Sequence, residues 1–257
     1  LWAATAVRRL RAAGDPRNQT WQRTLLWWRL KVAELLRAKG DLAGASKLAD
    51  ELREKFEMIS AAEPKDHRLK DRLVFVCRLQ AALWAEQGRD GAADAAARAL
   101  ELTESLLSVR QNYAYVSEGA SALITAGRVA HGRGDLETAQ RHWRRALELL
   151  EPHLNGSQHW RIVFPAAHAF ALLGQTDASR MLIERLQRIG FQPLDPWPDL
   201  RGGPERPAGR APGDLVAVPP EIGSQFSATQ CGVFRSERRA RLPQSQPIEM
   251  WKMRAYL

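Results

Sequence analysis

The stretch from Gly127 to Pro152, GRVAHGRGDLETAQRHWRRALELLEP, carries the pattern that predicts the fold of this chain. A short glycine–polar turn lies at Gly134, and Trp143, Ala146 and Leu150 recur at helical spacing after it. A glycine at such a turn can adopt the left-handed conformation that ends a helix. The stretch therefore predicts a helix, a tight turn and a second helix.

The same turn recurs along the first 190 residues of the chain. The turn glycines are Gly40, Gly88, Gly134 and Gly174, and each has an alanine four or five residues later, at Ala45, Ala93, Ala139 and Ala178. The glycines are separated by 48, 46 and 40 residues, and the pairs Asp15-Pro16 and Glu63-Pro64 share the first of these offsets. Two independent signals with one period predict an internal repeat.

Small residues also stand seven positions before each turn glycine. They are Ala33, Ala81, Gly127 and Ala167. Small side chains at these positions allow two helices to approach closely, and we expect the alanine after each turn to lie where the second helix crosses the first. A single helix pair cannot bury its apolar face alone, so neighbouring pairs must stack.

The pattern of glycine, alanine, tryptophan and proline from Gly127 to Pro152 resembles the tetratricopeptide repeat (TPR) family. The earlier units are similar to the long-repeat bacterial type found C-terminal to serine/threonine kinase or winged-helix domains. Over roughly residues 10–190, the resemblance implies an all-α fold, an α-solenoid of about four antiparallel helix pairs. The second unit departs from the pattern with Arg89-Asp90-Gly91 in its turn, and the fourth has a shortened turn.

The composition of the chain changes near residue 190. Ten of the 14 prolines lie between Pro193 and Pro247, whereas the preceding part is rich in helix-forming residues. We therefore predict a TPR-like helical repeat domain over residues 1–195 and a Pro/Gly/Arg-rich, disordered tail over residues 196–257. A tail of this composition would also result from a shifted reading frame.

Charge and cysteine content exclude several classes of protein. The net charge is +9, but it comes from an arginine- and alanine-rich composition typical of GC-rich genomes, so it is weak evidence for nucleic-acid binding. Two cysteines, Cys77 and Cys231, are too few for a disulfide framework or a four-cysteine zinc site. The chain has neither a signal pattern nor an apolar run of membrane-spanning length. We expect a cytoplasmic protein without membrane insertion.

No catalytic motif is present in the sequence. It contains no glycine-rich phosphate loop, no kinase signature and no His-Glu-x-x-His metal motif. We therefore expect no enzymatic activity, no cofactor and no metal. A small-molecule ligand has no motif to support it either.

The TPR resemblance implies a peptide-binding groove on the concave surface. In the family, the residues 13, 10, 6, 3 and 2 positions before the turn glycine face that surface. The candidate groove residues are Trp27, Leu30, Glu34, Arg37, Phe75, Arg78, Glu86, Arg128 and His131. Aromatic and arginine side chains together suit an extended or helical protein segment with acidic and apolar residues.

Two other functions remain open because they use the same fold. The chain would equally serve as the C-terminal regulatory region of a bacterial serine/threonine kinase, or as the sensor region of a winged-helix transcription regulator. In both cases the catalytic or DNA-binding domain lies outside this chain.

Overall fold

The computed structural model describes residues 19–155, 157, 159–198 and 200. In these residues it contains eight α-helices and no strand, so the predicted all-α class is confirmed. The helices are α2 (Gln19–Ala38), α3 (Leu42–Ala62), α4 (His67–Glu86), α5 (Ala92–Leu107), α6 (Tyr113–Gly132), α7 (Leu136–Leu154), α8 (Trp160–Leu172) and α9 (Thr176–Arg188). Most of the predicted tail lies outside the described residues. Within the described ranges, no helix combines the length and apolarity needed to cross a membrane.

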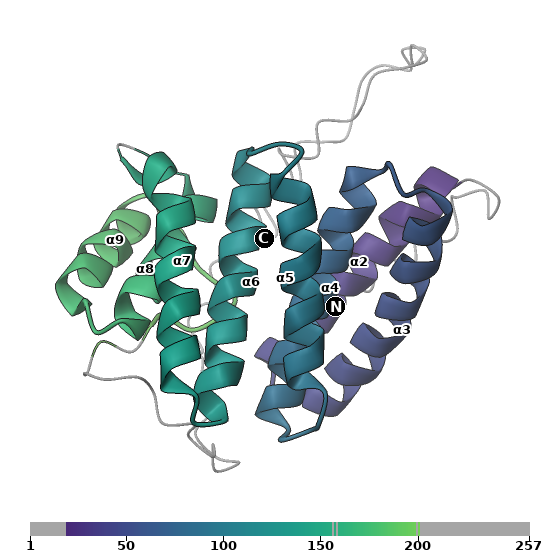
Figure 1. Cartoon of the computed structure of the whole chain (residues 1–257), viewed down its shortest axis with the longest axis horizontal. Coiled ribbons are helices and arrows are strands. Elements are labelled where there is room, and N and C mark those ends of the chain that lie inside the picture. Colours follow the sequence, from purple (N-terminus) through teal and green to yellow (C-terminus); the bar gives the residue numbers. More distant parts are fainter. Residues whose placement is uncertain (1–18, 156, 158, 199, 201–257) are drawn as a thin grey trace, which may run out of the picture. The chain divides into compact units, whose positions relative to one another are not determined.

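The helices pack in two layers. Each helix contacts the next one in sequence, and Figure 1 shows them following one another from α2 and α3 to α8 and α9. Further contacts join α2 to α4, α4 to α6 and α6 to α8, whereas the described odd-numbered helices make no such contacts with each other. We call α2, α4, α6 and α8 the even-helix layer, and its exposed side the even-helix face.

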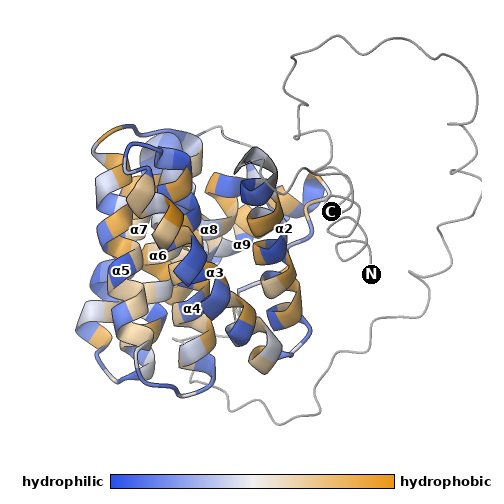
Figure 2. Cartoon of the chain, turned by 90° about the vertical axis from the view of Figure 1, so that its right-hand side faces the viewer, coloured by the Kyte–Doolittle hydropathy of each residue, from blue (hydrophilic) through white to orange (hydrophobic). Residues whose placement is uncertain are grey.

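Apolar residues fill the space between the two layers. Each helix in Figure 2 carries both hydrophobic and hydrophilic residues, as expected for amphipathic helices that bury one side. One buried cluster joins α2 to α5 and includes Leu30, Leu52 and Phe56, and a second joins α6 to α8 and includes Leu150 and Ile162. A third, smaller cluster joins α4, α5 and α6 through Ala81, Ala95 and Ala126. The buried apolar residues of the described helices thus form three clusters, each of which joins helices of both layers.

Each even-numbered helix ends in the same glycine turn. The backbone φ is positive at all four predicted glycines, with values of 84° at Gly40, 63° at Gly88, 84° at Gly134 and 77° at Gly174. The N–H of the following residue then bonds to the carbonyl four residues before the glycine. These bonds are Asp41 to Leu36 (3.0 Å), Arg89 to Trp84 (2.8 Å), Asp135 to Ala130 (3.0 Å) and Gln175 to Phe170 (2.9 Å). This is the Schellman arrangement, in which a left-handed glycine satisfies the last carbonyls of a helix.

The residue that follows two of these turns also starts the next helix. The carboxylate of Asp41 accepts a hydrogen bond from the N–H of Gly44 (2.9 Å), and that of Asp135 accepts one from Thr138 (3.0 Å). These are N-caps, which satisfy amide groups that the first helical turn leaves without partners. In the second unit the turn is longer, and Gly91 (φ 86°) takes the cap position.

The predicted crossing alanines are confirmed in two units and wrong in the other two. Ala45 and Ala139 are fully buried. In contrast, Ala93 and Ala178 are only partly buried. The helix-crossing position in those two units therefore lies elsewhere.

The crossing position is counted from the helix cap and not from the turn glycine. Ala95 and Ser179 each lie four residues after their cap, and both are fully buried. The Ser179 hydroxyl donates a hydrogen bond to the carbonyl of Ala167 (2.7 Å), so this helix pair approaches closely at the predicted small residue. In the second unit, two residues added to the turn shifted the register that sequence spacing had indicated. In the fourth unit the predicted shortening of the turn is wrong, because the cap Gln175 directly follows Gly174 and Ser179 has the same offset from the glycine as Ala45 and Ala139.

A close approach lies between α6 and α7. Gly127 packs directly against the indole of Trp143, and a Cβ atom at Gly127 would lie 2.2 Å from the indole nitrogen. Trp143 is buried, and its indole N–H donates to the carbonyl of Ile124 (3.4 Å). The other three units have alanine at the position of Gly127, so glycine here provides the space for the tryptophan ring.

We predict that Gly127→Ala destabilises the fold by about 1–3 kcal/mol, because the new methyl group cannot be placed without moving the buried Trp143 ring. Thermal unfolding followed by circular dichroism measures the effect. The matched control is Gly132→Ala at the end of the same helix, where a Cβ meets no atom within 4 Å. That change should be neutral or stabilising by up to about 1 kcal/mol. Equal melting temperatures for the two variants would contradict the tight contact.

Candidate functional site

The even-helix layer carries all the predicted groove residues, but it does not expose all of them. Trp27, Glu34, Arg37, Arg78, Glu86, Arg128 and His131 retain some solvent exposure. Leu30 has no exposed surface and belongs to the core, so it offers nothing to a partner. Phe75 is 7% exposed, but its ring contacts residues of the face from below.

An aromatic pair joins the first two helices of the layer. The rings of Trp27 on α2 and Phe75 on α4 meet edge to face, with centroids 5.7 Å apart. The ammonium of Lys31 lies 4.5 Å from the Trp27 centroid and 4.2 Å from that of Phe75. The guanidinium of Arg72 covers the Trp27 ring at 3.5 Å. Cations within 6 Å of an aromatic face are attracted to it, so this end of the face is both apolar and basic.

Arg78 holds α4 to α6 through an ion pair. Its Nε donates to a carboxylate oxygen of Glu118 (2.8 Å), and both side chains are only 17% exposed. Burial alone would lower the pKa of Arg78, but the charge and hydrogen bond of Glu118 outweigh it and raise the pKa. Arg78 is therefore charged and is already paired within the chain.

Arg37 makes two ion pairs from the last turn of α2. Its guanidinium donates to the carboxylate of Glu86 at the end of α4 and to that of Asp195 (2.9 Å), a residue beyond the last helix. Asp195 lies 158 positions away in sequence. The contact therefore joins the first described helix to the segment that follows α9.

A histidine pairs with the arginine of α6. A guanidinium nitrogen of Arg128 lies 3.0 Å from Nδ1 of His168 on α8, and the His168 ring meets Phe164 edge to face with centroids 4.6 Å apart. Burial, together with the nearby charge of Arg128, lowers the pKa of His168 from 6.5 to about 3. His168 is therefore neutral at pH 7 and accepts a hydrogen bond from the arginine through Nδ1.

Two of the predicted residues make their main contacts elsewhere. Glu34 pairs with Lys31, three residues earlier on the same helix (2.7 Å). The ring of His131 lies 5.9 Å from that of Trp143 on α7. These two residues are thus held by local neighbours and not by the central part of the face.

Several residues of the face were not predicted from sequence. Lys31, Asp71, Arg72 and Glu118 lie between the predicted positions, and Arg161, Phe164 and His168 come from α8. The last three stand 13, 10 and 6 positions before Gly174. The offsets applied to the first three units would therefore have found them in the fourth.

The segment after α9 lies against the even-helix layer. The Phe191 ring stacks on Trp160 (centroids 5.3 Å apart) and contacts Phe164 (5.4 Å). Trp197 meets the same Phe164 ring at 5.9 Å and Phe191 at 6.2 Å. Between these two aromatic residues the backbone bends at Leu194 and Asp195. We call residues 191–198 the C-terminal strap.

Several cations act on the carboxylate of Asp195. Partial burial would raise the pKa of Asp195, but the charges of Arg37, Arg78 and Arg128 outweigh it and lower the pKa below its usual value. These arginines come from α2, α4 and α6. Arginine charges from three helices thus lower the pKa of this one carboxylate, and of the three Arg37 pairs with it directly (2.9 Å).

Asp71 is the exception on this basic face. Burial raises the pKa of Asp71 from 3.8 to about 6, and the nearby negative charge of Glu118 adds to that rise. Arg72, Arg161 and Lys31 oppose it without cancelling it. Near neutral pH, the ionised form of Asp71 therefore lowers the stability of the folded protein.

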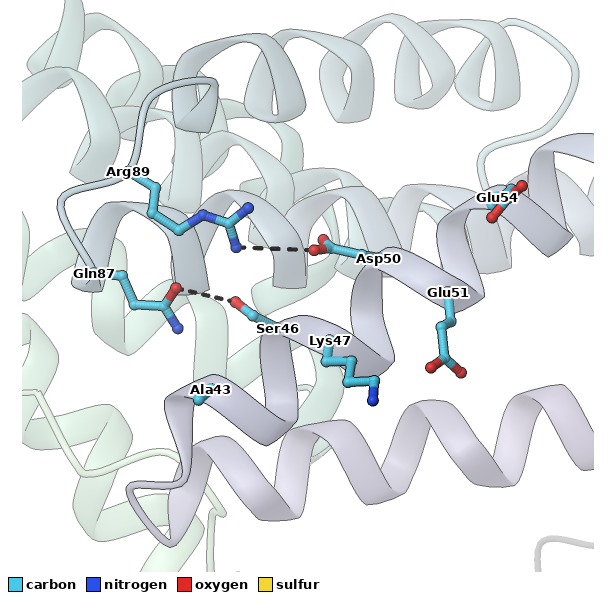
Figure 3. A pocket seen from close by; sticks show the side chains of 8 residues that line it. All are labelled: Ala43, Ser46, Lys47, Asp50, Glu51, Glu54, Gln87 and Arg89. Atoms are coloured by element: carbon cyan, nitrogen blue, oxygen red, sulfur yellow. Dashed lines mark hydrogen bonds and ion pairs between the residues drawn. The ribbon is translucent and has the colours of Figure 1, made fainter.

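A separate shallow depression lies on the outer side of α3 (Figure 3). Ala43, Ser46, Lys47, Asp50, Glu51, Glu54, Gln87 and Arg89 line it. Its polar groups bond to one another: Ser46 donates to Gln87 (3.3 Å), and Arg89 lies 3.8 Å from Asp50. Among the described residues, no three His, Cys, Asp or Glu side chains gather closely enough to hold a metal ion.

Comparisons with known proteins identify no relative. No protein-family model, no curated protein and no solved structure matches this chain. The function must therefore be inferred from the residues and their arrangement.

We predict that Asp71→Asn stabilises the protein at pH 7.5 by about 1–2 kcal/mol, because it removes a carboxylate whose charged form the fold disfavours. The folded-state pKa lies above the unfolded value, so the gain should shrink as the pH falls from about 6 to about 4, where the wild-type carboxyl binds a proton. Thermal melting at several pH values measures this. His168 titrates in both proteins and cancels in the comparison.

The matched control for this pH experiment is Asp177→Asn, because the side chain of Asp177 is 89% exposed. This variant should change stability little, because the exposed Asp177 carboxylate stays in water when the chain folds. A constant difference between wild type and Asp71→Asn from pH 4 to pH 7.5 would contradict the assignment.

Proposed function

We propose that this chain is an α-solenoid of four TPR-like helix pairs whose even-helix face forms a concave, peptide-binding groove. The contacts between alternate helices support it, because they join α2, α4, α6 and α8 and are not made by the described odd-numbered helices. Such asymmetry is expected when helix pairs stack with their first helices on the inner side of a curve. The common glycine turn at the end of each even-numbered helix adds further support.

The ligand is a protein segment that carries carboxylate and aromatic or aliphatic side chains. The observation that carries this proposal is the ion pair of Arg37 with the Asp195 carboxylate (2.9 Å), on which the charges of Arg78 and Arg128 also act. Guanidinium groups bind carboxylates through bidentate hydrogen bonds, and they keep their charge when partly buried. Trp27 and Phe164 lie on the same face and supply apolar contact area.

The internal ion pairs of the face do not prevent binding. Arg37 is 20% exposed and its partner Glu86 is 39% exposed, so this pair is partly solvated. Exposed ion pairs contribute only about 0–1 kcal/mol each, and a ligand carboxylate can replace one partner at little cost. A peptide therefore exchanges one set of ion pairs for another and gains the burial of its apolar side chains.

A kinase or a transcription regulator would use the same groove for the same purpose. As a regulatory region of such a protein, the repeat domain would bind the partner segment and transmit its presence to the attached domain. The binding activity proposed for the face does not depend on which of these parents the chain has.

We predict that the full chain selects acidic–aromatic peptides from a displayed random library, and that Arg37→Glu combined with Arg78→Glu abolishes the selection. The two changes place negative charge where the ligand carboxylate binds. Sequencing of the bound peptides, with affinities measured on the most enriched ones, provides the readout. Circular dichroism melting checks that the variant is folded, and Arg37→Gln with Arg78→Gln replaces it if it is not.

The matched control for the selection reverses two arginines of the odd-numbered helices. Arg145 on α7 and Arg180 on α9 are 71% and 56% exposed, so Arg145→Glu with Arg180→Glu makes the same change in net charge away from the face. The control should keep the peptide preferences of the wild type. The proposal is wrong if both double variants select the same peptides with unchanged affinity.

A further inference from the structure

We propose that the C-terminal strap is an intramolecular ligand of the even-helix face, and that the partner of the face is a segment of the same chemistry that displaces it. This chemistry is a carboxylate two residues before a tryptophan, with a proline on each side of the tryptophan. The inference rests on the proposed function, because it names the ligand class and the regulation of the same groove.

The strap has the composition of a recognition segment. Its sequence is FQPLDPWP over residues 191–198, so Pro196 and Pro198 flank Trp197. Proline fixes its own backbone φ and restricts the residue before it, which reduces the entropy lost on binding. The strap contains neither helix nor strand, and it follows the Schellman turn at Gly190 that ends α9. Its position therefore depends on the contacts of its side chains with the helices.

Two kinds of contact hold the strap on the face. At one end of the helical stack, Phe191 and Trp197 enclose the Phe164 ring of α8. At the other end, Asp195 pairs with Arg37 of α2. Aromatic anchors combined with a carboxylate bound by arginine are the same elements that the groove would use for a separate protein segment. The strap thus spans the first and the last of the even-numbered helices.

The strap combines an exchangeable ion pair with a more firmly held aromatic part, since Pro198 is buried and Phe191 and Trp197 pack on Phe164. The Asp195 side chain is 44% exposed, so its ion pair with Arg37 competes with water and contributes little. Leu194 is 57% exposed and takes no part in the core. In contrast, the residues beneath the strap, such as His168, are buried. The strap can therefore leave while the helical stack stays folded.

Tethering makes this weak ligand an effective competitor. A segment joined to its site by a short link acts at an effective concentration in the millimolar range. A free partner binds only the fraction of molecules in which the face is open, so its apparent affinity falls by that fraction. The strap therefore outcompetes weak or incomplete ligands. A segment with both the carboxylate and the aromatic side chains binds tightly enough to displace it.

Competition between the strap and a free copy of itself tests the proposal. A fluorescent peptide with the sequence of residues 191–198 is titrated with the full wild-type chain and with the full chain carrying Asp195→Lys and Trp197→Ala, and fluorescence anisotropy is measured. We expect the double variant to bind the peptide at least tenfold more tightly, because its own strap no longer occupies the face. A chain carrying only Asp195→Asn provides the milder variant if the double one does not fold, and should bind the peptide more tightly than the wild type does.

Matched controls separate release of the strap from general damage. Gln192→Ala with Leu194→Ala changes two exposed strap residues and should leave peptide binding as weak as in the wild type. Adding Arg37→Glu to the strap-released chain should abolish binding, as should replacing the aspartate by lysine or the tryptophan by alanine in the peptide. If either altered peptide, the one with lysine for the aspartate or the one with alanine for the tryptophan, still bound with unchanged affinity, the proposed ligand chemistry would be wrong.

Failure of this inference is distinguishable from failure of the proposed function. Equal affinity of the peptide for the wild type and the strap-released chain would show that the strap does not occlude the face, while peptide binding by the groove would stand. Absence of binding to both chains would overturn the ligand chemistry. The library selection then decides independently whether the groove binds any peptide.

Discussion

The left-handed glycine that ends each even-numbered helix is the constraint on which the rest of the structure depends. A positive φ is available to glycine without the steric cost that a Cβ imposes, and it lets the chain reverse direction while the last carbonyls of the helix find partners. The cap that follows starts the next helix at once, as at Asp135. Because this turn recurs at Gly40, Gly134 and Gly174, each even-numbered helix packs in the same way against the odd-numbered helix that follows it. The common face, with its arginines and aromatic rings, follows from that repetition.

Close helix contact is the second requirement, and the chain meets it with different residue pairs. Where the α8–α9 pair crosses, the Ser179 hydroxyl bonds to the backbone at Ala167. In the α6–α7 pair, Gly127 leaves room for the whole indole of Trp143. Interiors are close-packed, so volume removed from one helix must be supplied by its neighbour. The stack is therefore regular in its backbone although its core side chains differ from unit to unit.

The charged residues of the even-helix face have partners within the chain. Arg78 bonds to Glu118, Arg128 to His168, and Arg37 to both Glu86 and Asp195. Charged groups taken partly out of water need such partners, and these pairs also hold the even-numbered helices together. Under the proposed function, a ligand would substitute for an existing partner, and the strap residue Asp195 is the most exposed carboxylate bound by an arginine of this face. The proposal therefore couples the stability of the free protein to ligand access at Arg37.

The sequence by itself determined the helical class and the four turns, because backbone conformation and helical periodicity are local properties. The placing of Trp27, Arg37, Phe75 and Arg78 on one layer of helices was implied by the resemblance to the TPR family. The sequence did not determine the crossing position at Ala95, since two residues added to that turn change a register that only the folded cap defines. Nor did it indicate the burial of Leu30, the partners of Arg78 and Arg128, or the contact of Asp195 with Arg37. Those depend on which surfaces meet when distant segments stack, and a separation of 158 residues leaves no periodic signal in the chain. Only the tertiary structure decided that the strap lies on the face that its own repeats create.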